Sequence, residues 1–248
     1  MSELGHPETR SYAQVAELYE RVRPSYPDEA VTWLTDRLDI GASSTVLDLG
    51  AGTGKLTRAL VPIAGRVIAV EPGPEMLAQL QRCVPEAEAI LGAAEAIPLG
   101  DESIDAVLCG QSFHWFREGE AVAEIRRVLR PGGGLGLIWN VRDPEDSLQR
   151  EITALLEPFV PRGRAVATGV GAFVRRTFGE VASSVMPFEE ELDSDTVAAR
   201  IASISFVAAA PEAKRRELED AVRELVAKRG GQVPFRYMTE AYVPLSVG

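Results

Sequence analysis

The residues best suited to chemistry are an aspartate and three glycines at alternate positions, Asp48, Gly50, Gly52 and Gly54. The apolar residues before Asp48 predict a buried strand, and the residues after Gly54 predict a helix. Glycine allows close approach of the backbone to a ligand and tolerates positive φ. Ligands of open α/β sheets bind at such strand-to-helix turns. The run therefore predicts a ligand-binding turn.

The glycine spacing decides which ligand this turn accepts. In the dinucleotide pattern G-x-G-x-x-G, the third glycine would fall at Lys55. In the phosphate-binding pattern G-x-x-x-x-G-K-S/T, the first glycine would fall at Leu49 and the Ser/Thr at Leu56. Both patterns fail, so an NAD-binding oxidoreductase and a nucleoside triphosphatase are disfavoured.

An acidic partner follows at Glu71. The apolar, β-branched run 66–70 predicts a buried parallel strand that ends at this residue, and Pro72-Gly73-Pro74 breaks the chain before the next helix. An acid about 20 residues beyond a glycine turn, at the end of the second strand, suits hydrogen bonding to ribose hydroxyls. A solvated strand-end carboxylate is the alternative interpretation.

The pattern D-x-G-x-G-x-G with an acidic second strand end resembles motif I of the class I S-adenosylmethionine-dependent methyltransferases. The resemblance implies S-adenosylmethionine as cofactor, S-adenosylhomocysteine as product, and ribose binding by Glu71. It also implies that the loop Gly92–Pro98 flanks the adenine, with Ala94 and Glu95 at the matching positions. The cofactor-binding residues that it implies are Tyr19, Arg23, Asp48, Gly50, Ala51, Gly52, Glu71, Pro72, Met76, Ala94, Glu95, Gln111 and Ser112.

The N-terminal segment carries a second resemblance. Residues 19–27 are similar to the Y-x-x-x-R-P-x-Y-P lead-in of trans-aconitate-type and related small-molecule methyltransferases. There the segment forms a lid over the cofactor, and Tyr19 and Arg23 match its motif. An arginine suits the methionine carboxylate, because its guanidinium binds carboxylates bidentately. We expect residues 10–26 to order over the cofactor, the alternative being a docked surface helix.

The fourth predicted strand leads into Gln111-Ser112-Phe113-His114-Trp115-Phe116, beside the glycine turn where the methyl group is expected. His114 is the candidate catalytic residue. An imidazole accepts a proton near neutral pH, so His114 is expected to act as general base for a hydroxyl acceptor or to orient it. The alternative is that His114 only packs against Trp115 and the lid.

The element order predicts an α/β fold with a doubly wound sheet, because strands and helices alternate in the first half. The resembling family has a mostly parallel, seven-stranded Rossmann-like sheet with one antiparallel strand near the C-terminus. Strands are expected near 45–49, 67–71, 87–91, 104–110, 134–140, 185–191 and 235–245, and helices near 54–63, 74–83, 118–130, 144–157, 194–204 and 211–229. Gly132–Gly134 is expected to form a helix-to-strand turn, and residues 235–245 a half-buried edge strand.

We expect residues 1–248 to form one domain with four parts. These are an N-terminal lid at 1–30, a cofactor-binding half at 40–141, a substrate-cap insertion at 142–192, and the C-terminal helices and last strand at 193–248. The acceptor pocket is expected between the lid, Phe113–Phe116 and the insertion, because loops at this edge of a doubly wound sheet face the ligand crevice.

Composition excludes several classes of function. The 248 residues are 46% hydrophobic and 25% charged, and no apolar run approaches the length of a membrane span. The net charge of −11 disfavours nucleic-acid partners, since phosphate contacts dominate such binding. Arg126, Arg127 and Arg130 are interpreted as a solvated helix face. Cys83 and Cys109 form no metal or redox motif, no metal site is predicted, and the N-terminus predicts no signal peptide, so we expect a cytoplasmic protein.

Together these observations predict a methyltransferase that moves the methyl group of S-adenosylmethionine to an O, N or C nucleophile of a small molecule. Two alternatives remain open at this point. One is a protein of the same fold that binds the cofactor without methyl transfer, as a cyclase or regulator, and the other is a protein methyltransferase. The expected partners are a small-molecule acceptor, with no nucleic acid or membrane, for a monomer or homodimer.

Overall fold

The computed structural model describes residues 16–160 and 170–247. Its centre is a seven-stranded sheet in the order β3-β2-β1-β4-β5-β7-β6. The first five of these strands pair in parallel, β7 runs antiparallel to β5, and β6 runs antiparallel to β7. The strands are β1 (Thr45–Leu49), β2 (Arg66–Glu71), β3 (Glu88–Leu91), β4 (Ile104–Gly110), β5 (Leu129–Arg142), β6 (Val181–Asp193) and β7 (Gln232–Pro244).

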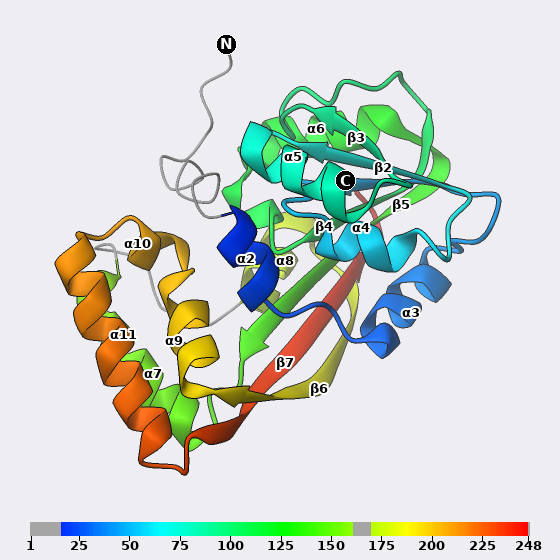
Figure 1. The fold of residues 1–248 in the computed structure, drawn as a ribbon. Coiled ribbons are helices and arrows are strands. Elements are labelled where there is room, and N and C mark those ends of the chain that lie inside the picture. The colour runs from blue at the N-terminus through cyan, green and yellow to red at the C-terminus, as the bar shows by residue number, and fades with distance from the viewer. Residues whose placement is uncertain (1–15, 161–169, 248) are drawn as a thin grey trace.

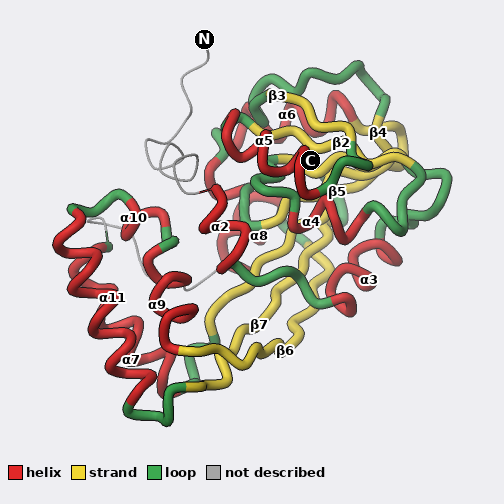
Figure 2. Tube along the Cα trace, in the orientation of Figure 1, coloured by secondary structure: helices red, strands yellow, loops and turns green. Residues whose placement is uncertain are grey.

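Helices cover both faces of this sheet (Figure 2). They are α2 (Ala16–Val22), α3 (Asp28–Arg37), α4 (Lys55–Leu60), α5 (Pro74–Cys83), η1 (Phe113–Trp115), α6 (Glu118–Val128), α7 (Ser147–Leu156), η2 (Glu157–Phe159), α8 (Val170–Phe178), α9 (Ser194–Ala202), α10 (Ser205–Ala208) and α11 (Glu212–Ala227). Apolar residues of α6 and α8 pack with Leu47 and Leu49 on one face, whereas α3 and α4 pack with Val46 on the other. Because successive strand residues point to opposite faces, Asp48 lies on the α3 and α4 side.

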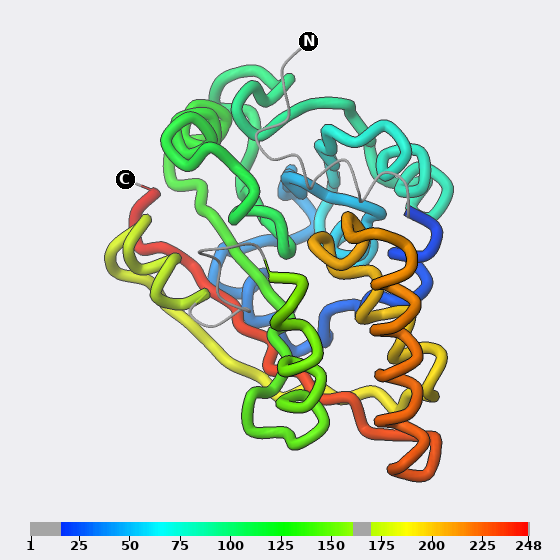
Figure 3. Tube along the Cα trace, turned by 90° about the vertical axis from the view of Figure 1, so that its left-hand side faces the viewer, coloured from blue at the N-terminus to red at the C-terminus, as the bar shows by residue number. Residues whose placement is uncertain are grey.

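A helical lobe is attached to the long strands β5, β6 and β7. Helices α7, α9 and α11 gather on the left of Figure 1, and α7 runs beside α11 in both Figures 1 and 3. Their apolar faces share one buried cluster with Phe235 and Tyr237 of β7. Helix α2 contacts both α9 and α5, so it bridges the lobe and the parallel part of the sheet (Figure 1).

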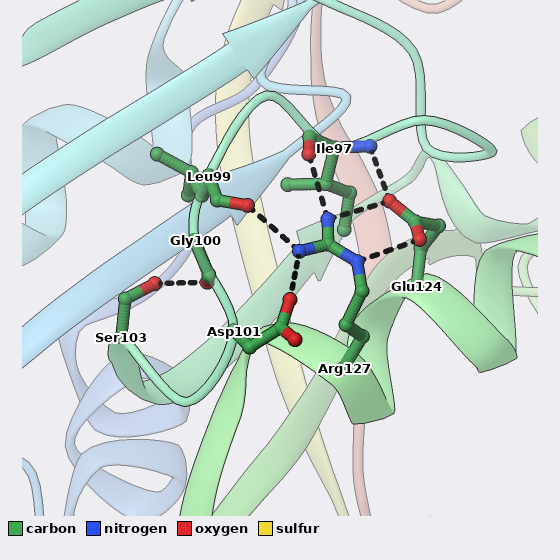
Figure 4. Close-up of polar contacts among 7 residues, drawn as sticks. All are labelled: Ile97, Leu99, Gly100, Asp101, Ser103, Glu124 and Arg127. Atoms are coloured by element: carbon green, nitrogen blue, oxygen red, sulfur yellow. Dashed lines mark hydrogen bonds and ion pairs between the residues drawn. The ribbon is translucent and has the colours of Figure 1, made fainter.

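The connection between β3 and β4 is fixed by Arg127 of α6 (Figure 4). Its guanidinium donates hydrogen bonds to the backbone oxygens of Ile97 and Leu99, each at 2.8 Å. It also pairs with the carboxylates of Glu124 at 2.7 Å and Asp101 at 2.8 Å. Arg127 is therefore a structural clamp, and its interpretation as a solvated face residue was wrong.

The seven-stranded, mostly parallel sheet confirms the predicted fold class, while several boundaries differ. Strand β7 is not an edge strand, because the 13-residue β6 pairs along its outer side. Gly132–Gly134 lies inside β5, which begins at Leu129 with a register shift against β4. Helices α3 and α8 were not predicted; α3 begins at Asp28, so the last residues of the expected lid belong to a core helix.

The segments expected as lid and insertion are described only in part. Residues 1–15 of the expected lid and 161–169 of the expected insertion lie outside the described residues. No helix in the described ranges is long and apolar enough to cross a membrane.

Candidate cofactor and active site

The glycine turn leaves β1 and enters α4 with three residues at positive φ. Gly50, Gly52 and Gly54 have φ of 70°, 58° and 89°. Residues that carry a Cβ seldom adopt this left-handed backbone conformation. The backbone N–H groups of Gly50 and Ala51 donate to Val70 O of the adjacent β2 at 2.8 and 3.1 Å. The turn is therefore tied to the second strand, which carries the predicted acidic partner.

Glu71 ends β2 and reaches back to this turn. Its Oε2 accepts from Gly52 N at 2.8 Å and its Oε1 accepts from Gly73 N at 2.9 Å. Burial raises the pKa of Glu71 to about 7, the nearby Asp48 adds to the rise, and the two backbone hydrogen bonds oppose it. A carboxylate has about four lone-pair positions. Two are used here, so the group retains the capacity to accept hydrogen bonds from a ligand.

Asp48 lies beside Glu71 at the end of β1 and is buried. Its Oδ2 accepts from Thr57 Oγ1 of α4 at 2.6 Å, whereas its buried Oδ1 has no hydrogen-bond partner among the described residues. Burial raises the pKa of Asp48 to about 6 against the hydrogen bonds from Thr57. Buried polar atoms are seldom unsatisfied, so the orphaned oxygen indicates a ligand that supplies a donor.

A cavity of about 160 Å³ lies over the turn. Because one water molecule needs about 10–15 Å³ by this measure, the cavity accommodates a ligand much larger than water. Twelve of the predicted site residues line it, namely Tyr19, Arg23, Asp48, Gly50, Ala51, Gly52, Glu71, Pro72, Met76, Gln111, Ser112 and His114. Sequence reasoning missed other residues of the wall, including Tyr26, Thr53 and Lys55.

Ala94 and Glu95 are not among the lining residues of this cavity. Ala94 is 4% exposed and packs in the main core. Glu95 Oε1 accepts from Arg117 N at 2.7 Å, next to the start of α6. The structure does not bring these two residues together with the other predicted residues, because their short loop is held against α6.

The described part of the expected insertion also stays away from the cavity wall. None of its residues in 142–160 or 170–192 lines the cavity. Strand β6, which forms its last part, belongs to the sheet. Of the segments expected to form the wall of the acceptor pocket, the lid segment lines the cavity with residues that include Tyr19 and Arg23, and the segment after β4 lines it with His114–Phe116.

The helix α2, which lies in the segment expected to form a lid, is attached to the glycine turn through Glu20. The Glu20 carboxylate accepts from Thr53 Oγ1 at 2.6 Å and from Arg58 Nη2 at 2.7 Å. Lys55 Nζ donates to Glu20 O at 2.8 Å. Burial alone would raise the pKa of Glu20, but the hydrogen bonds from Thr53 and Arg58 and the nearby cations outweigh it and lower the pKa. The same turn that lines the cavity therefore also holds α2, whose Tyr19 is another lining residue.

Replacing Glu20 with alanine should release α2. We expect faster amide hydrogen exchange over residues 16–22 and an S-adenosylhomocysteine affinity lower by about three- to tenfold, because the binding-competent state is less populated. Since the folded-state pKa of Glu20 is lowered, its contribution is present above the unfolded pKa and is lost as the pH falls through the folded pKa. Glu17→Ala, at an exposed position of the same helix, is the control. Equal exchange in both variants would contradict the attachment.

The segment after β4 turns sharply toward the glycine turn. Gln111 has φ of 57°, and its Nε2 donates to Asn140 O of β5 at 3.3 Å. Ser112 Oγ donates to Leu49 O at 2.7 Å, directly before the glycines. These contacts hold the segment 113–116 at the carboxyl edge of the sheet, where His114, Trp115 and Phe116 line the cavity. Phe113, which was expected in the same wall, is instead buried in the main core.

Gly50→Ala should destabilise the protein more than Gly52→Ala. A Cβ at Gly50 would lie 2.7 Å from the Ser112 Cβ, whereas a Cβ at Gly52 would meet no atom within 4 Å. Both variants incur about 1–2 kcal/mol for a left-handed conformation, and Gly50→Ala adds about 1–3 kcal/mol of overpacking. Urea unfolding midpoints measure the difference. Equal midpoints would show that Ser112 moves aside without strain.

His114 is positioned by Trp139 of β5. Trp139 Nε1 lies 3.3 Å from His114 Nδ1, and an indole nitrogen only donates hydrogen bonds. Nδ1 must therefore be the acceptor, and the neutral imidazole carries its proton on Nε2. Of the two roles predicted for His114, this arrangement favours orientation of the acceptor over general-base catalysis, because the ring presents a donor at Nε2.

The fold and the glycine turn define a class of protein, and comparison with known proteins agrees with that class. Residues 47–137 match the family described as methyltransferase domain. An uncharacterized methyltransferase of Mycobacterium tuberculosis is 42% identical over 221 residues, which cover 88% of this chain and 86% of the relative. An uncharacterized methyltransferase of Schizosaccharomyces pombe is 36% identical over 233 residues, covering 90% and 92%.

A solved structure supports the same class. The structure of a proposed type II methyltransferase from Anaeromyxobacter dehalogenans superposes with a TM-score of 0.66 at 25% identity, covering 90% of this chain and 95% of that one. The chain belongs to the class I S-adenosylmethionine-dependent methyltransferases.

Proposed function

We propose that this methyltransferase binds S-adenosylmethionine in the cavity over the glycine turn and methylates a small molecule. The observation that carries the proposal is the pair of buried acids, Asp48 and Glu71, on one wall of a cavity built on that turn. Both carboxylates have raised pKa values without a ligand. A ligand with cationic sulfonium and ammonium groups and ribose hydroxyls would offset these charges and satisfy the orphaned oxygen of Asp48.

The residues fit this cofactor. Glu71 would accept hydrogen bonds from the ribose hydroxyls while it retains its bonds to Gly52 and Gly73. Asp48 Oδ1 would accept a hydrogen bond from the ligand. Arg23 lines the same cavity, and its buried Nε has no partner in the part of the chain that the structure describes, so its guanidinium would bind the methionine carboxylate.

When bound, S-adenosylmethionine supplies a methyl group activated by a positively charged sulfur. The chain must then hold two reactants in line and exclude water. Tyr19 and Arg23 of the lid segment cover the cavity, and Gln111 and Ser112 fix the segment that carries His114. His114 would orient the acceptor as a hydrogen-bond donor.

A small-molecule acceptor is supported by the size of the cavity and by its cover. The helix α2, whose Tyr19 lines the cavity, is attached beside the glycine turn through Glu20, and in this position it would hinder a folded protein from reaching the turn. The net charge of −11 disfavours an RNA acceptor.

The test is incubation of the protein with methyl-labelled S-adenosylmethionine and a panel of hydroxy, amino, carboxylic and carbon-acid acceptors, followed by mass spectrometry. We expect a labelled small-molecule product and one equivalent of S-adenosylhomocysteine. Cofactor binding without any methylated product would favour a non-transferring relative of the fold. Labelled protein in place of small molecules would favour a protein methyltransferase.

A further inference from the structure

A polar layer lies between the ends of β5 and β7 and the helices of the lobe. Arg142 of β5 pairs in register with Tyr237 of β7, and the next pair on the same face is Asn140 with Thr239. Thr239 Oγ1 donates to Asn140 Oδ1 at 2.7 Å. Gln111, which lines the cofactor cavity, donates to Asn140 O. The layer is therefore continuous with the wall of the proposed active site.

Three arginines from three different elements converge on this layer. Arg142 Nη2 donates to Thr153 Oγ1 of α7 at 3.1 Å. Arg200 of α9 donates to the Tyr237 hydroxyl at 3.2 Å. Arg23 of the lid segment donates to Ser203 O, at the end of α9, at 3.0 Å. Arg23 is close enough to affect the charged state of both Arg142 and Tyr237.

The positive charges of this layer exceed its negative charges. Arg200 pairs with the Glu190 carboxylate, and within residues 16–160 and 170–247 its buried Nε has no partner. Arg142 contacts only the neutral groups of Gln149 and Thr153 among the described residues. Burial lowers the pKa of Arg142 to about 10, Tyr237 opposes this change, and Arg23 adds to it. The side chain of Arg142 is only partly buried, and a cation withdrawn in part from water without a carboxylate beside it has a desolvation cost that an anion would offset.

Tyr237 adds a donor at the same place. Its hydroxyl oxygen accepts from Arg200, and within the part of the chain that the structure describes no group accepts its hydrogen. A tyrosine hydroxyl both accepts and donates. The hydroxyl can therefore donate to an anion that lies against Arg142.

We propose that Arg142 and the Tyr237 hydroxyl bind an oxyanion group, a carboxylate or phosphate, of the methyl acceptor. The inference rests on the proposed function, in which Arg23 is directed at the cofactor and Arg142 remains uncompensated. A guanidinium matches the geometry of such oxyanions and holds them bidentately. Arg142 does not line the cofactor cavity, so the acceptor would extend from the methyl group, past Gln111, beyond that cavity to the layer between β5 and α7.

The experiment measures thermal unfolding of the full chain with saturating S-adenosylhomocysteine at constant ionic strength. Succinate, its neutral diamide succinamide, and inorganic phosphate are titrated separately. We expect a saturable rise in Tm with succinate or phosphate and none with succinamide. Succinate alone would identify a carboxylate acceptor and phosphate alone a phosphorylated one.

Variants locate the anion. Arg142→Gln should raise the anion concentration that gives half of the maximal rise in Tm by about 10- to 100-fold, as expected for loss of a charged hydrogen bond. Arg150→Gln, at an exposed position of α7, should leave it unchanged. Without anion, Arg142→Gln should be no less stable than wild type, because the variant removes an unpaired charge. If Arg142→Gln fails to fold, Tyr237→Phe, which removes only the hydroxyl, should weaken the response instead.

Equal anion responses in wild type, Arg142→Gln and Tyr237→Phe would overturn the inference, as would an equal effect of succinamide. Calorimetry with S-adenosylhomocysteine separates this failure from that of the proposed function. Retained cofactor binding without an anion response overturns only the acceptor assignment, whereas lost cofactor binding overturns both.

Discussion

Replacing Glu71 with alanine should weaken binding of S-adenosylmethionine by about 5- to 150-fold. The variant removes a carboxylate expected to accept two hydrogen bonds from the ribose, a loss of about 1–3 kcal/mol. It also removes the partner of Gly52 N in the glycine turn. Isothermal titration calorimetry measures the change. Glu75→Ala, an exposed acid of the same segment, should bind like wild type, and unchanged affinity in Glu71→Ala would remove Glu71 from the site.

The pH dependence offers a second measure of the same carboxylate. The pKa of Glu71 is about 7 without ligand, and only the ionised form accepts on both oxygens, so cofactor affinity should fall as the pH drops below about 7. Stability should change in the opposite direction. The folded-state pKa of Glu71 is raised, so its contribution to the free energy of unfolding is present below the unfolded pKa and is lost as the pH rises through about 7. Glu71→Gln should flatten both curves.

Replacing His114 with alanine should lower kcat/KM for the acceptor by about 10- to 100-fold, the effect of losing one orienting hydrogen bond in the reacting complex. Cofactor affinity should stay within about threefold. General-base catalysis would instead contribute about 10²–10⁴-fold and give the pH–rate profile a limb that depends on His114. Steady-state kinetics with the acceptor found by the labelling experiment decide between these roles.

Trp139→Phe is the informative companion to His114→Ala. It keeps most of the buried ring but removes the N–H that faces His114 Nδ1. The imidazole then loses the contact that fixes its tautomer, so activity should fall. A Trp139→Phe enzyme with the wild-type rate would show that the tautomer does not matter.

Local patterns predicted most of the sheet, because β1, β2 and β4 are buried apolar runs that end at chemically distinctive residues. The boundaries of β5 and the neighbours of β7 were harder to predict from the sequence. Gly132–Gly134 has the composition of a turn, yet pairing with β4 draws it into a strand. Apolar and polar residues alternate along β7 as in an edge strand, yet β7 has a second neighbour, because β6 pairs along its outer side. No local pattern in the sequence reveals that pairing. Long-range pairing decided both cases.

The residues of the candidate site also fall into those that a local motif predicts and those that only long-range contacts bring to the site. Residues fixed by the motif, such as Asp48, Gly52 and Glu71, come together because neighbouring parallel strands end at one edge of the sheet. The bond from Thr53 to Glu20 joins positions 33 residues apart, and the bond from Arg23 to Ser203 joins positions 180 apart. Such contacts depend on how α2 docks against the lobe. Lys55 was visible only as the residue that breaks the dinucleotide pattern.

The most direct test of the account is a crystal structure of the protein with S-adenosylhomocysteine. We expect the ribose hydroxyls within hydrogen-bonding distance of the Glu71 carboxylate, the ligand against Gly50 and Gly52, and its sulfur directed toward the segment that carries His114. A ligand bound elsewhere on the molecule, with Glu71 still joined only to Gly52 and Gly73, would contradict the central claim.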